Sequence, residues 1–90
     1  GTRLTTGALN RTLRDLVAQN PPPSRGRHPL RIYYATQPST HPPTFVLFCN
    51  DPRRMTQSYQ RYIENQFRQR FKLMATPMKL VLRASHKSAA

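Results

Sequence analysis

Apolar residues recur at helical spacing in two stretches of the chain. The first stretch predicts an amphipathic helix over residues 6–19, which Thr5 or Thr6 would cap and the prolines after Asn20 would end. Its apolar positions fall at i, i+4, i+7 and i+8: Leu9, Leu13, Leu16 and Val17. The second stretch predicts a helix over about residues 56–72, with one apolar stripe: Tyr59, Tyr62, Ile63, Phe67 and Phe71.

Three shorter stretches predict strands: residues 30–37 and 78–84 show alternation, and residues 44–49 are a more apolar run. Pro38 to Pro43 would form a short turn, so the first two strands are expected to make an antiparallel hairpin. The element order is then αββαβ. This is an α+β chain, and a three-stranded sheet with both helices on one face is the natural packing for its single small core.

The alternation assigns the strand residues to two sheet faces. The face under the helices would bury these side chains: Leu30, Ile32, Tyr34, Phe45, Leu47, Met78, Leu80 and Leu82. The other face is too apolar for an ordinary solvent-exposed surface. Its aromatic rings could stack on bases, but its valines favour packing against a neighbouring domain. We therefore predict a docking surface made of Arg31, Tyr33, Val46, Phe48, Val81 and Arg83, with Lys79 beside it.

The net charge is +12, from 15 Lys and Arg against 3 Asp and Glu. This balance favours nucleic acid or an acidic surface as partner. The three acids, Asp15, Asp51 and Glu64, are far apart in sequence, which argues against a two-carboxylate hydrolase or a carboxylate metal site. The single Cys49 suits a reducing compartment and is expected to be a buried strand residue. No apolar run is long enough to span a bilayer.

Basic residues in three places are candidates for RNA contact. Arg25 and Arg27 flank Gly26 in a proline-stiffened loop, and stiffening lowers the entropy lost on binding. Two further arginines would lie at a helix entrance that Asp51 caps, with Pro52 at the first helical position. A third group lies on the polar side of the second helix. These residues could contact RNA or could simply form the solvent-exposed face of an amphipathic helix. The last two groups comprise Arg53, Arg54, Arg61, Arg68 and Lys72.

Several motifs together are distinctive of one family. They are Leu9-Asn10, Pro21-Pro22-Pro23, Arg25-Gly26-Arg27, Arg31 to Gln37, Pro42 to Phe48, Asn50, Ser58 to Asn65, Phe71, Thr76-Pro77 and Leu80 to Arg83. Over roughly residues 4–84 the chain resembles the C-terminal KH-like domain of bacterial tandem GTPases of the Der (EngA) type. The family usually has a glycine where this chain has Ala75, which changes a turn conformation.

The resemblance implies one KH-like domain over residues 1–90, with its core at about 6–84 and a tail at 85–90. Such a domain follows two GTPase domains in a protein that assembles the large ribosomal subunit. It contacts ribosomal RNA and docks on the GTPase domains of its own polypeptide, whose GTP and Mg it does not bind itself. We therefore expect a monomeric, cytoplasmic, ribosome-associated protein without membrane contact, or an organellar one. The start at Gly1 favours a piece of a longer protein.

Two motif absences shape the functional expectation. The glycines Gly1, Gly7 and Gly26 cannot form a phosphate-binding G-x-x-x-x-G-K-[ST] loop, and no catalytic constellation or paired metal ligand is apparent, so we expect no enzymatic activity and no cofactor in this domain. No GXXG loop is present either, so RNA contact would be electrostatic and shape-based. The alternatives are a free-standing basic RNA-binding or ribosomal protein and a module that binds acidic proteins.

Overall fold

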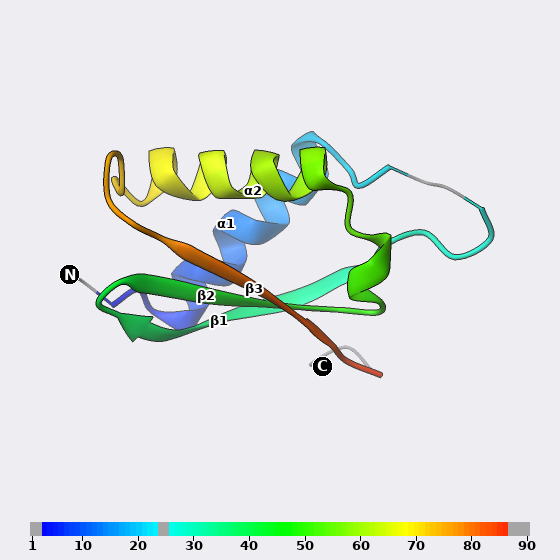
Figure 1. Cartoon of the computed structure of the whole chain (residues 1–90), viewed down its shortest axis with the longest axis horizontal. Coiled ribbons are helices and arrows are strands. Elements are labelled where there is room, and N and C mark those ends of the chain that lie inside the picture. The colour runs from blue at the N-terminus through cyan, green and yellow to red at the C-terminus, as the bar shows by residue number, and fades with distance from the viewer. Residues whose placement is uncertain (1–2, 24–25, 87–90) are drawn as a thin grey trace.

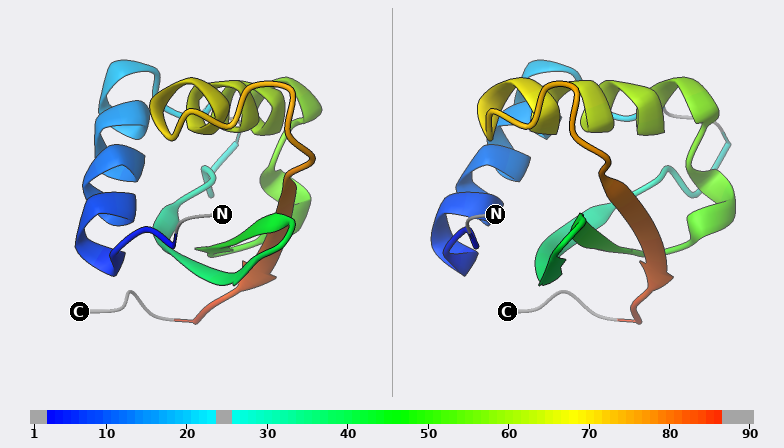
Figure 2. Two further views of the ribbon diagram at one scale, coloured as in Figure 1. Left: turned by 90° about the vertical axis from the view of Figure 1, so that its left-hand side faces the viewer. Right: turned by 60° about the vertical axis from the view of Figure 1, so that its left-hand side comes forward.

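The computed structural model describes residues 3–23 and 26–86. Its elements are α1 (Thr6–Gln19), β1 (Ile32–Thr40), β2 (Pro43–Cys49), the 3-10 turn η1 (Pro52–Arg54), α2 (Gln57–Arg70) and β3 (Lys79–Ala84). The three-stranded sheet has the order β1-β2-β3, with β2 antiparallel to β1 and parallel to β3. Both helices lie on one side of it (Figures 1 and 2), which confirms the α+β KH-like fold class. No helix in the described ranges could cross a membrane.

The helix boundaries follow from their caps. The Thr5 hydroxyl accepts from the Ala8 amide at 3.1 Å, so α1 covers the predicted residues 6–19. Asp51 and Pro52 begin only the short turn η1. The chain leaves that turn, and the hydroxyl of Thr56 then caps α2 by accepting from the Tyr59 amide. The second helix therefore begins one residue later than predicted and ends two residues earlier.

The predicted turn over residues 38–43 was too long. Only residues 41 and 42 form the turn, and β1 continues through Pro38. A proline cannot donate to a strand ladder, so it is tolerated only where its missing amide costs nothing, as on an edge strand. Since β1 is an edge strand of the sheet, the hairpin is longer than the prolines suggested.

The prediction that Tyr34 faces the core was wrong. The pairing of β1 with β2 shifts between Ile32 and Tyr34, which leaves Tyr33 without a register partner. An extra residue in one strand moves every following side chain to the opposite face. Tyr34 therefore stacks on Phe48 outside the core, with ring centroids 4.5 Å apart, and Ala35 is buried in its place.

The core lies between α1, α2 and the inner sheet face. Leucines of α1 pack there with Ile63 and Phe67 of α2, and with Phe45 and Leu47 of β2. Leu80 and Leu82 of β3 pack against this cluster as predicted. Cys49 is fully buried, and this burial raises the pKa of its thiol.

Two residues between α2 and β3 adopt left-handed backbone conformations. Lys72 has φ 58°, and the amides of Leu73 and Lys72 donate to the carbonyls of Arg68 and Gln69 at 2.8 and 3.4 Å. This pattern is the Schellman motif that commonly ends a helix. Ala75, in the next turn, has φ 61°. A side chain makes this conformation unfavourable for any residue except glycine.

Replacing Ala75 by Gly should therefore stabilise the chain by ~1 kcal/mol, because the left-handed conformation costs an alanine about 1–2 kcal/mol and the more flexible unfolded glycine offsets part of that. The thermal midpoint of the 90-residue chain should rise by roughly 4 °C. Ala18→Gly, at an exposed position inside α1, is the matched control and should lower stability by about 0.5–1 kcal/mol. Equal losses in both variants would contradict the assigned strain.

Candidate nucleic-acid interface

The loop after α1, the start of β1 and the segment after β2 meet at one end of the molecule. Asn50 joins them: its side-chain amide donates to the carbonyl of Pro29 at 2.9 Å, and its side-chain oxygen accepts from the Arg31 amide at 3.0 Å. Its backbone amide also donates to the Arg31 carbonyl at 3.0 Å. One asparagine thus holds the returning loop against the end of β2.

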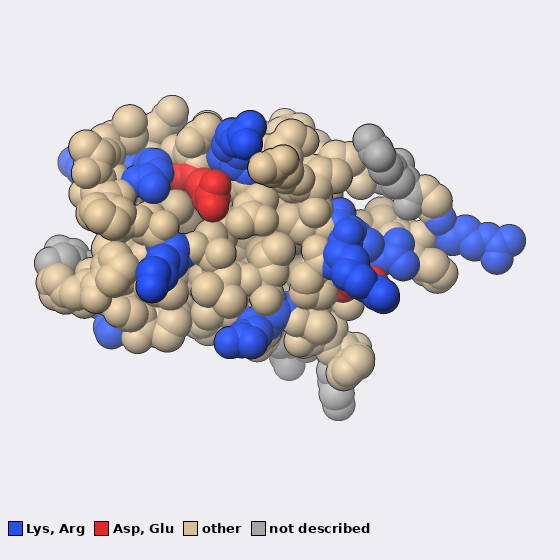
Figure 3. Space-filling view, viewed as in Figure 1, with Lys and Arg blue, Asp and Glu red and all other residues tan. Residues whose placement is uncertain are grey.

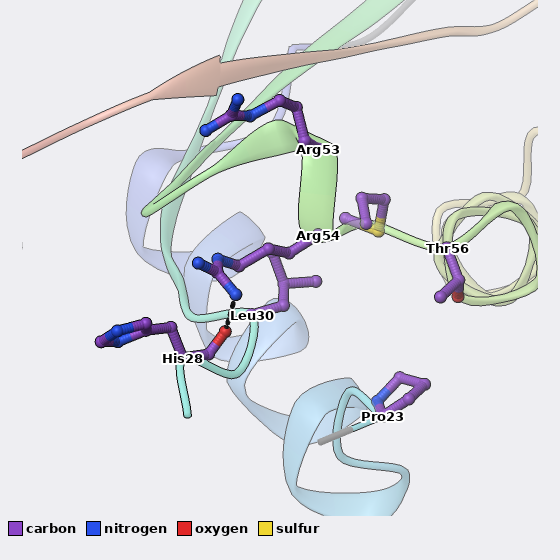
Figure 4. A pocket seen from close by; sticks show the side chains of 7 residues that line it. Pro23, His28, Leu30, Arg53, Arg54 and Thr56 are labelled. Atoms are coloured by element: carbon purple, nitrogen blue, oxygen red, sulfur yellow. Dashed lines mark hydrogen bonds between the residues drawn. The ribbon is translucent and has the colours of Figure 1, made fainter. Parts of the chain in front are cut away.

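Arg54 makes a second connection to this loop, since its guanidinium donates to the carbonyl of His28 (Figure 4). The two segments enclose a hollow of about 260 Å³, lined by Pro23, His28, Leu30, Arg53, Arg54, Met55 and Thr56. Only about a third of the Arg54 side chain is exposed (35%). Its position is therefore fixed before any ligand binds, which lowers the entropy lost on binding.

Arg53 is held differently. Its backbone amide and its guanidinium both donate to Asp51, at 3.0 to 3.1 Å. These hydrogen bonds keep the pKa of Asp51 below its usual range, and those from the Arg53 side chain have the largest effect. The side chain of Arg53 is nonetheless 91% exposed, so most of it remains accessible to an anion.

The seven residues predicted to contact RNA divide into three groups. Arg25 lies outside the described residues, while Arg27 is exposed next to His28 and joins Arg53 and Arg54 at one end. Figure 3 shows basic side chains gathered at the right-hand end of the molecule and others scattered over the remaining face. Arg31, predicted as a docking residue, precedes β1 and belongs to the same end. We call Arg27, Arg31, Arg53 and Arg54 the basic end.

The other candidates lie along α2 and beyond its last turn. Arg61 and Lys72 are exposed. Arg68 instead donates to the carbonyls of Leu73 and Thr76 and so supports the connection to β3. No sequence pattern indicates this role, because the two acceptors are backbone atoms of a turn.

The predicted docking residues of the sheet occupy its outer face, with one exchange. Val46 pairs with Val81, and Phe48 pairs with the exposed Arg83. Tyr34 stands beside Phe48 where Tyr33 was expected. The apolar side chains of this face are half-buried by one another. The face is therefore a ridged mixture of rings, valines and an arginine rather than a broad exposed apolar patch.

Comparisons with known proteins agree with this fold. The family model for the KH-domain-like C-terminal part of EngA bacterial GTPase enzymes matches residues 3–83. The chain is 46% identical to GTPase Der of Thermomicrobium roseum over 87 residues, which is 97% of this chain and 19% of that protein. It is 50% identical to GTPase Der of Syntrophobacter fumaroxidans over 82 residues, 90% of this chain and 18% of that protein.

The chain belongs to the EngA KH-domain-like family. It spans about a fifth of the length of the curated relatives it matches. The GTPase motifs of those proteins lie in their other regions, and this KH-like domain is non-catalytic.

Several motif residues that carry the family resemblance hold the fold together. The Asn10 side chain bonds α1 to β1, through both the amide and the carbonyl of Ala35. The hydroxyls of Tyr59 and Tyr62 donate to carbonyls at the end of α1, those of Asn20 and Leu16, at 2.8 and 2.7 Å. The Leu16 carbonyl also accepts from the Asn20 amide at 3.1 Å, so the Tyr62 hydroxyl is its second donor. The Tyr59–Asn20 bond and the bonds of Asn50 thus hold the two ends of the loop that carries Arg27.

Proposed function

We propose that this chain is the RNA-contacting C-terminal domain of a Der-type GTPase that acts in assembly of the large ribosomal subunit. The basic end carries the proposal. Arg27, Arg31, Arg53 and Arg54 lie together on segments that Asn50 and the Arg54–His28 contact hold in place. A held group of guanidiniums suits the phosphates of ribosomal RNA, because arginine presents several donors in a rigid fork.

The remaining partners and location follow from the same proposal. The outer sheet face docks on the GTPase domains of the same polypeptide, where GTP and Mg are bound. The chain itself offers no glycine loop for a nucleotide phosphate, since its glycines are Gly1, Gly7 and Gly26. The protein acts as a monomer in the cytoplasm or an organelle, bound to ribosomal particles.

Binding of the 90-residue chain to large-subunit ribosomal RNA should weaken steeply with salt, because each neutralised phosphate releases counterions. Arg27→Gln should reduce the slope of log affinity against log salt by about 0.7–0.9 and weaken binding roughly threefold at moderate salt. Fluorescence anisotropy over a potassium chloride titration measures both quantities.

Arg14→Gln is the matched control, because Arg14 is exposed on α1 and lies outside the basic end. It removes the same charge, so a similar loss of slope in both variants would mean that RNA senses only the net charge. An unchanged slope in Arg27→Gln would count against the basic end. Sedimentation of the complete polypeptide with large subunits, with and without Arg27→Gln, tests the role in the assembled particle.

A further inference from the structure

The two edges of the sheet differ in how their backbone groups are hydrogen-bonded. On β1, the Asn10 side chain donates to the carbonyl of Ala35 at 2.9 Å and accepts from its amide at 2.7 Å. Two positions along, the Gln37 carbonyl accepts from Arg3, and the Gln37 side-chain oxygen accepts from the Leu4 amide. The middle of this edge is therefore closed by side-chain and N-terminal contacts, and no further strand can pair with it there.

Among the residues that the structure describes, none makes such contacts with the outer edge of β3. The Ser85 amide donates to the Cys49 carbonyl of β2 at 2.7 Å, which sets the direction in which successive backbone groups point. Because these groups alternate in a parallel ladder, the amides and carbonyls of Leu80, Leu82 and Ala84 point away from β2. None of them hydrogen-bonds to any residue within 3–23 or 26–86. Such a row of unpaired groups is a template for another strand.

The side chains around this edge are basic. Lys79 and Arg83 of β3 are both exposed on the outer face, with the half-buried Val81 between them. The η1 turn contacts β3, and Figure 4 shows its Arg53 side chain extending toward the strand. With a net charge of +12, a second copy of the chain would be repelled from this edge. Charge complementarity therefore favours an acidic strand.

We propose that the outer edge of β3 binds an extended acidic segment of a protein, which pairs with the backbone of Leu80, Leu82 and Ala84 as an added strand. Main-chain hydrogen bonds supply the affinity in this mode of recognition, and alternate side chains supply the specificity. Acidic residues four positions apart in the segment would face Lys79 and Arg83, with an apolar residue over Val81. The pairing residues Leu80, Leu82 and Ala84 lie outside the basic end, so the proposal does not require RNA contact there; Arg53 lies near both sites.

The peptide acetyl-Thr-Glu-Thr-Val-Thr-Glu-Thr-amide is a suitable probe for the 90-residue chain. Amide hydrogen exchange followed by NMR reports the pairing at each position. Exchange at Leu80, Leu82 and Ala84 should slow when the peptide is added, since their amides gain acceptors. The amides of Val81 and Arg83 already face β2 and should change little. A peptide N-methylated at alternate residues cannot pair and should not protect the edge.

Charge variants test the specificity. Lys79→Glu combined with Arg83→Glu should weaken binding of the acidic peptide about tenfold and favour a peptide with Lys in place of Glu. Arg61→Glu combined with Lys72→Glu makes the same change in net charge on and after α2 and should weaken binding far less. The proposal is overturned if the peptide does not bind, if it binds without protecting the three edge amides, or if both double variants lose affinity equally.

Discussion

Replacing Asn10 by Ala should destabilise the chain by ~2–5 kcal/mol, because the amide and the carbonyl of Ala35 would both lose their partner in a dry environment. Asn10 is 9% exposed and Ala35 is 0% exposed, so water cannot replace the lost bonds. The third bond of the side chain, to the Thr6 carbonyl at 2.9 Å, would also be lost. Domains of this size are stable by roughly 5–15 kcal/mol, so the loss is a large fraction of the total.

Urea unfolding of the 90-residue chain measures this change, and Asn65→Ala is the matched control. Asn65 is an exposed asparagine of α2, and removing it should change stability by no more than about 0.5 kcal/mol. A loss of less than 1 kcal/mol in Asn10→Ala would show that α1 and β1 separate at little cost. Such a result would also remove the contrast between a closed β1 edge and an open β3 edge.

The elements of this fold were predictable where one local pattern decides them. Spacing of apolar residues located α1, and Thr5 and the prolines after Asn20 fixed its ends. The hairpin and the third strand followed from the strand patterns and the element order, whereas the parallel pairing of β3 with β2 was not predicted. Tyr34 was misplaced because an irregularity in strand pairing has no signature in the alternation itself. Asn10 lies next to Leu9 in the sequence, but nothing in the sequence indicates that its side chain bonds with the backbone of Ala35.

The sequence predicted that arginines would form the candidate site, but only part of how they are grouped in space. The net charge and the arginine pairs pointed to an anionic partner, and three of these arginines do lie together: Arg27, Arg53 and Arg54. Their grouping depends on Asn50, which joins the loop to the end of β2 through contacts about twenty positions apart in sequence. Arg68 was predicted to contact RNA, but its guanidinium instead donates to backbone carbonyls of the turn before β3. Contacts of this kind arise from tertiary structure and leave no periodicity to detect.

The hydroxyl of Tyr59 should make stability depend on pH in the alkaline range. Burial of this side chain, and to a smaller extent the neighbouring Tyr62, raises the pKa of Tyr59 to about 12. An unfolded tyrosine titrates near 10. Below pH 10 the phenol is protonated in both states, so its full contribution to stability is present. Between pH 10 and 12 the unfolded chain releases the proton first, so stability falls until the folded phenol also ionises.

The size of this loss follows from the shift. A change from 10 to about 12 corresponds to ~2.7 kcal/mol at full value. The hydroxyl donates to Asn20, which is exposed, so solvent screens it and we expect roughly half of that value. Tyr59→Phe lacks the titrating group and the bond to Asn20. It should be less stable than the unmodified chain by about 1 kcal/mol at pH 7 and should approach or exceed it by pH 12.

Urea unfolding curves at intervals from pH 8 to pH 12 measure the difference between the two chains. Tyr33→Phe is the control, because no described residue hydrogen-bonds to the Tyr33 hydroxyl, and its curve should stay parallel to that of the unmodified chain. If Tyr59→Phe lost stability above pH 10 as steeply as the unmodified chain, the Tyr59 hydroxyl would not be the group responsible.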